Sequence, residues 1–122
     1  MAQQLLSDWQ LEVTRGPGWL FVKVHPPERD EADAQRDLAE RVWEILQNHF
    51  TYRIVLELDE LPRLDSSVIG QLVLLYKRVH QQGGILRLCG LSKRNLDTLA
   101  VCQLGSRLPT FDCRDDAIRG QG

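Results

Sequence analysis

The sequence predicts an α/β protein, in which helices pack on a small mixed β-sheet made of an N-terminal hairpin and parallel strands. Two observations lead to this prediction. Two apolar, alternating runs at residues 9–15 and 19–24 flank Gly16-Pro17-Gly18, which is typical of the turn of a hairpin. After the hairpin, short strands alternate with helical patterns, and such βαβ units place their strands in parallel.

The first half of the chain contains one predicted helix between two strands. Pro26-Pro27 ends the second strand of the hairpin. The helix predicted next, over residues 28–50, has apolar residues at helical spacing and acids in its first turns, where the helix dipole favours them. Residues 52–61 are rich in branched side chains and short in extent, so we expect a central strand.

The second half continues the alternation. A helix over 64–82 is ended by Gly83-Gly84, and a strand over 85–91 follows. Ser92 is the expected N-cap of the next helix, which we expect to bury Leu96, Leu99 and Ala100. The last predicted elements are a short extended piece and a helical turn within 108–118.

Composition favours a single soluble domain over residues 1–122, because a chain of this length buries about two thirds of its surface. The net charge of -2 gives no reason to expect direct nucleic-acid binding. No segment approaches the roughly 20 apolar residues that cross a bilayer, so we expect no membrane insertion. Three cysteines without CxxC spacing fit reduced thiols in the cytoplasm, with Cys89 in the core.

Catalytic and metal sites are poorly supported by the residue pattern. Ser67, His80 and Asp97 lack the Gly-x-Ser-x-Gly elbow of a hydrolase, and His80 lies far along the helix from Ser67. His25, His49 and His80 are scattered outside metal-ligand spacing, and no glycine run has the sequence of a phosphate loop. We therefore expect no enzyme activity, no cofactor and no bound metal.

The stretch "LDSSVIGQLVLLYKRV", residues 64–79, divides into two faces when about 100° is allowed per helical residue. Ser66 falls at the edge of the apolar arc and suits an N-cap turned into the fold, whereas Ser67 is expected to point to solvent. The expected outward stripe continues from Ser67 through Gln71, Leu74 and Arg78. The apolar arc consists of Val68, Ile69, Leu72, Val73, Leu75, Tyr76 and Val79.

Two interpretations of the serines remain open at this point. Asp65, Ser66 and Ser67 are residue types that any helix N-terminus prefers, so they could serve only as a cap. Alternatively, a solvent-facing Leu74 beside Ser67 is a plausible binding epitope. Phosphorylation of Ser67 would add a charge of about -1.5 to -2, which a helix N-terminus tolerates. A partner packed over Leu74 would then lose about 3 to 4 kcal/mol, a factor of hundreds in affinity.

The run "IVLELDELPRLDSSVIGQLVLLYKRVHQQGGILRLCGLS" resembles the STAS domain of bacterial anti-sigma factor antagonists. In that family a strand, a loop, Asp-Ser-Ser-Gly and a helix are followed by Gly-Gly, a strand and Gly-Leu-Ser. The resemblance implies a regulator without enzyme activity, which binds an anti-sigma factor that is usually also a serine kinase. By position, Ser67 is the implied phosphoacceptor, with Asp65 and Ser66 as motif neighbours. Phosphorylation abolishes binding in the family, and a phosphatase restores it.

The chain departs from the family pattern at two places. Val68 stands where a glycine usually follows the two serines, and "HPPERDEAD" stands where a Gly-Glu-Leu-Asp stretch is common. The first departure leaves an alternative, namely an unphosphorylated STAS interaction subunit of a transporter or signalling assembly, in which Ser66 and Ser67 only cap the helix. The expected partner surface is Gln71, Leu74 and Arg78.

Overall fold

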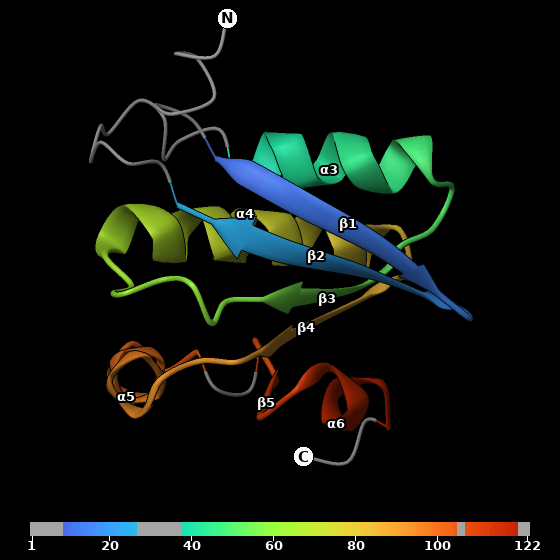
Figure 1. Cartoon of the computed structure of the whole chain (residues 1–122). Helices are drawn as coiled ribbons and strands as arrows, with labels where there is room; N and C mark the ends of the chain where they lie inside the picture. The colour runs from blue at the N-terminus through green and yellow to red at the C-terminus, as the bar shows by residue number, and fades with distance from the viewer. Residues whose placement is uncertain (1–8, 27–37, 105–106, 120–122) are drawn as a thin grey trace, which may run out of the picture.

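A five-stranded mixed sheet forms the centre of the computed structural model, which describes residues 9–26, 38–104 and 107–119 (Figure 1). β1 and β2 pair as an antiparallel hairpin, and every later neighbour in the order β1-β2-β3-β4-β5 pairs in parallel. The predicted sheet is therefore confirmed. The strands are β1 (Gln10–Gly16), β2 (Trp19–His25), β3 (Arg53–Glu57), β4 (Ile85–Cys89) and β5 (Thr110–Phe111).

Four helices are found in the described part of the chain: α3 (Leu38–Asn48), α4 (Ser66–Gln81), α5 (Lys93–Val101) and α6 (Arg114–Arg119). The helix predicted over 28–50 is confirmed over 38–48, and its last two predicted positions form a turn instead. Its first ten predicted positions lie outside the described residues, as does residue 27 onward of the stretch that replaces Gly-Glu-Leu-Asp. The strand predicted over 52–61 ends at Glu57, because the backbone turns into a loop there.

The main core lies between one face of the sheet and helices α3, α4 and α5. Side chains alternate along each strand, so every second residue of β2, β3 and β4 reaches this core. The buried strand residues of this face are Leu20, Val22, Val24, Ile54, Leu56, Leu86 and Leu88. The helices contribute Leu38, Val42 and Leu46 from α3, Val68, Leu72, Leu75 and Val79 from α4, and Leu99 from α5.

The opposite face of the sheet has a smaller core under α6. Phe21, Val55 and Cys89 pack there with Ala117, which confirms the prediction that Cys89 is a core residue. Burial away from water raises the pKa of the Cys89 thiol to about 12. Helix α6 is held to this face because Arg87 Nη1 donates a hydrogen bond of 2.7 Å to the carbonyl oxygen of Ala117.

Helix α5 is rotated relative to the prediction. Leu99 is buried as expected, but Ala100 is exposed and Leu96 keeps 36% of its surface in solvent. The residue that α5 buries together with Leu99 is Asn95, four positions earlier and therefore on the same face. The apolar pattern missed this rotation because the buried position carries a polar side chain.

Candidate functional site

Helix α4 begins at the end of the β3–α4 loop, which we define as residues 58–65. Asp65 is the N-cap: its backbone is extended, at φ -100 and ψ 176, and its side chain accepts a hydrogen bond from the Val68 amide. That bond is 2.9 Å long. The prediction that Ser66 caps the helix and turns into the fold is wrong, because Ser66 is already the first helical residue and is exposed. A carboxylate at this place also gains from the helix dipole.

Ser67 lies where the helical angle predicts it, on the solvent side of the first turn of α4. Within the part of the chain that the structure describes, its hydroxyl makes no hydrogen bond or other polar contact, since Asp65 already serves the cap. The next residue, Val68, is turned into the core and is only 2% exposed. The serine hydroxyl is therefore free at the surface while its neighbour anchors the helix.

The outward orientation predicted for Gln71 and Arg78 is confirmed only in part, because both side chains are half-exposed and turn toward α3. Gln71 is partly buried, and its Oε1 accepts a hydrogen bond of 2.9 Å from the backbone amide of Ala39 in α3. Arg78 forms a 3.1 Å ion pair with Glu40, and its guanidinium lies 5.8 Å from the ring centroid of Trp43. Both side chains join α4 to α3, because α3 packs along that side of α4. Whether they also contact a partner stays a prediction.

The side chains that face solvent from the first three turns of α4 form what we call the exposed α4 face. Leu74 is its large apolar member, with 47% of its surface accessible, so its predicted exposure is confirmed. Gly70 belongs to the same face, and a Cβ placed on it would meet no atom within 4 Å. The sequence reasoning missed Gly70, although its helical angle places it between the other members. The exposed α4 face consists of Ser66, Ser67, Gly70, Leu74 and Lys77.

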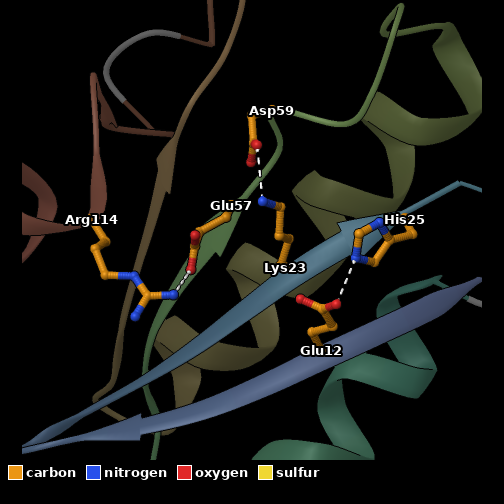
Figure 2. Close-up of polar contacts among 6 residues, drawn as sticks. All are labelled: Glu12, Lys23, His25, Glu57, Asp59 and Arg114. Atoms are coloured by element: carbon orange, nitrogen blue, oxygen red, sulfur yellow. Dashed lines mark hydrogen bonds and ion pairs between the residues drawn. The ribbon is translucent and has the colours of Figure 1, made fainter.

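The β3–α4 loop is anchored at its start. Leu58 donates a hydrogen bond of 2.9 Å from its amide to the carbonyl of Cys89, which ties the loop to the end of β4. Asp59 forms an ion pair of 3.1 Å with Lys23 of β2, as Figure 2 shows. The hydrogen bond that Lys23 donates to this carboxylate, followed by the carboxylate's negative charge, raises the pKa of Lys23. Leu58, Leu61 and Leu64 are buried, so the loop lies on the core rather than projecting from it.

The structure does not bring the residues of a hydrolase triad together. Ser67 and His80 are 13 positions apart on one helix, a rise of about 20 Å. The His80 ring instead stacks on Tyr76, with centroids 5.6 Å apart. Asp97 is exposed on α5. In the described ranges no three His, Cys, Asp or Glu side chains are grouped so that they could hold a metal ion.

Each of the described helices is too short or too polar to cross a bilayer. Three features stand out in the first turns of α4. They are a free serine hydroxyl, a capping carboxylate and an exposed leucine.

Known structures share this fold. The protein TM1081 from Thermotoga maritima is 16% identical, with a TM-score of 0.77 over 90% of this chain and 92% of that one. An anti-sigma factor antagonist from Mycobacterium paratuberculosis is 17% identical, with a TM-score of 0.75 over 93% and 94% of the two chains. The anti-sigma factor antagonist SpoIIAA in its unphosphorylated form is 16% identical, with a TM-score of 0.69 over 93% and 98%.

The sequence itself provides the family assignment. No curated protein sequence matched the chain. A model of the STAS domain does match it, over residues 31–117, which includes the whole of the β3–α4 loop and helix α4. This match covers most of the chain, and the fold agrees with it. The chain therefore belongs to the STAS domain family.

Proposed function

We propose that this protein is an anti-sigma factor antagonist, which binds an anti-sigma factor and thereby frees a sigma factor for transcription. The observation that carries the proposal is the free, solvent-facing hydroxyl of Ser67 beside an exposed leucine on helix α4. Family membership and the similarity of fold to two anti-sigma factor antagonists support the same role. Such a regulator acts in the cytoplasm by binding, without a cofactor and without catalysing a reaction.

Phosphorylation of Ser67 is the proposed switch, with the anti-sigma factor acting as the serine kinase. A phosphate in the first turn of α4 would meet the unpaired amides and the positive end of the helix dipole, so the fold tolerates it. The same group adds about -1.5 to -2 charges beside Leu74, where a partner must displace water. A phosphatase that removes the group restores binding.

Val68 replaces the family's glycine without covering the acceptor. Its side chain is packed in the core with Leu72 and other residues of the main cluster, on the side of the helix away from solvent. The branched side chain therefore leaves the approach to the Ser67 hydroxyl open. This geometry favours the phosphorylated antagonist over the unphosphorylated interaction subunit.

The proposed docking surface is the exposed α4 face, with Leu74 as its apolar anchor. Gln71 and Arg78 border this surface, where they fix helix α3 against α4. We expect each of them to contact the partner and also to hold α3 in place beside the docking surface. Substitution of either residue would remove one of the contacts that fix α3 against α4. Lys77 supplies an exposed positive charge on the same face.

The deciding experiment is phosphorylation by the anti-sigma kinases of the same organism, with ATP and site mapping by mass spectrometry. Ser66→Ala is the matched control for Ser67→Ala, because both serines are exposed in the same turn and differ only in their angle. We expect one phosphate on the wild type and on Ser66→Ala, and none on Ser67→Ala. Incorporation that is equal in the two variants would reject Ser67 as the acceptor. No incorporation with any cognate kinase would favour the unphosphorylated subunit.

A further inference from the structure

Among the described residues, Asn95 is the one Asn, Gln, Ser, Thr, His or charged residue that is buried, and its exposed fraction is 0%. A buried amide is costly unless its donor and acceptor groups are hydrogen-bonded. It stands on α5, while the motif of the proposed switch stands at the start of α4. A polar group at this depth therefore calls for a specific set of partners.

Those partners are backbone groups of the β3–α4 loop. The Asn95 Oδ1 accepts a hydrogen bond of 3.0 Å from the Leu64 amide. Its Nδ2 donates one of 3.3 Å to the Leu61 carbonyl oxygen. Leu61 and Leu64 are themselves buried, so without Asn95 both backbone groups would lack a partner away from water.

The position of these bonds connects them to the proposed acceptor. Leu64 directly precedes Asp65, so a fixed Leu64 amide also fixes the N-cap and the direction in which α4 begins. Asn95 is held in turn by the cap of its own helix, because its amide donates a hydrogen bond of 3.2 Å to Ser92 Oγ. The start of α5 and the start of α4 are thus joined through one side chain.

The loop is confined from a second direction by Gly90. This glycine has φ +77, and a Cβ on it would lie 3.0 Å from the Asp59 Cβ and 3.2 Å from the Asp59 amide nitrogen. The loop therefore passes close to the chain after β4 at one end and is bonded to α5 at the other. Both contacts act on the loop in the conformation seen here.

We infer that Asn95 is a positioning residue, which holds the β3–α4 loop in the conformation that presents Ser67 to the kinase and the exposed α4 face to the anti-sigma factor. This inference rests on the proposed function. If the loop were released, only a fraction of molecules would present the competent conformation. The apparent affinity of every partner that needs this conformation would fall by the same fraction.

The experiment compares two variants of the full chain with the wild type. Asn95→Leu removes both hydrogen bonds at similar volume. Leu99→Ala is the control, because it weakens the same helix at a buried position and leaves both hydrogen bonds from Asn95 to the loop in place. Urea denaturation establishes that each variant is folded and how much stability it has lost. The measurements are kinase KM and kcat with the chain as substrate, the Kd for the anti-sigma factor, and hydrogen exchange at the Leu64 amide.

For Asn95→Leu we expect the KM and the Kd to rise by the same factor, about tenfold, with kcat within about twofold of the wild type. Exchange at the Leu64 amide should accelerate. Leu99→Ala should leave KM and Kd within about twofold. An unchanged KM and Kd in Asn95→Leu, or an equal rise in Leu99→Ala, would overturn the positioning role.

Asn95→Asp provides a second route if Asn95→Leu does not fold. A neutral carboxyl can donate to the Leu61 carbonyl oxygen, whereas the carboxylate cannot, so the defect should shrink as the pH falls from about 8 to about 6. A KM ratio to the wild type that stays constant over this range would count against the inference. If Ser67 of the wild type takes up no phosphate, the proposed switch is refuted. The Kd for the anti-sigma factor and the rate of hydrogen exchange at the Leu64 amide still decide the role of Asn95.

Discussion

Truncation of Leu74 tests whether the exposed α4 face binds a partner or only completes the fold. Full burial of a leucine side chain is worth about 1.5 to 3 kcal/mol, and Leu74 keeps 47% of its surface in solvent. Leu74→Ala should therefore lower the free energy of unfolding by about 1 kcal/mol. Leu72→Ala is the matched control, because Leu72 is 0% exposed two positions earlier, and the same truncation there should cost about 2 to 5 kcal/mol.

The two variants should rank oppositely in stability and in affinity for the anti-sigma factor. Urea denaturation should show the larger loss of stability in Leu72→Ala. Titration calorimetry with the anti-sigma factor should show the larger loss of affinity in Leu74→Ala, where removal of a central apolar anchor raises Kd at least about tenfold, or about 1.4 kcal/mol. A loss of stability in Leu74→Ala that equals the one in Leu72→Ala would refute the exposed position. Unchanged affinity in Leu74→Ala would refute the docking surface.

Three further predictions concern the helix cap, a helix glycine and a buried thiol. Asp65→Ala should lower the free energy of unfolding by about 1 kcal/mol through loss of the bond to the Val68 amide, and Ser66→Ala by less than about 0.5 kcal/mol, both by urea denaturation. Gly70→Ala should raise it by about 0.5 to 1 kcal/mol, since a Cβ meets nothing within 4 Å; a lower urea midpoint would contradict this expectation. The pKa of Cys89 is raised from 9.0 to about 12, so the unfolded chain loses this proton first and stability should fall as the pH rises between these values. Denaturation at several pH values should show a shallower fall in Cys89→Ala, and an identical fall would assign the effect to other groups.

The sequence was sufficient to predict the mixed sheet and the buried side of α4. Gly16-Pro17-Gly18 indicates the hairpin because these residue types form a tight turn, and so short a connection forces the flanking strands to pair in antiparallel. The apolar arc of α4 locates Val68, Leu72 and Val79 in the core because a helix repeats its angle regardless of what surrounds it. Ser67 was placed at the surface by the same argument.

The errors arose where a neighbour that is distant in the sequence decides the outcome. The helical angle of Gln71 places it on the polar side of α4. The periodicity of α4 does not reveal that α3 packs along this side, where the Ala39 amide donates a hydrogen bond to Gln71. Asparagine is a residue type usually found at the surface. The burial of Asn95 depends on hydrogen bonds to a loop more than 30 positions earlier in the sequence. Such contacts follow from the tertiary arrangement, which local periodicity does not specify.

The hydrogen bond between Gln71 and the Ala39 amide joins the second turn of α4 to the first described turn of α3, and it leaves the N-terminus of α4 open to solvent at Ser66 and Ser67. The N-terminus of α4 carries about half a positive charge, which the Asp65 carboxylate at the N-cap already faces. A phosphate of about -2 would more than cancel this charge. If the proposed switch operates, phosphorylation of Ser67 would therefore make the start of α4 strongly negative, so that it would repel the acidic groups of an approaching protein.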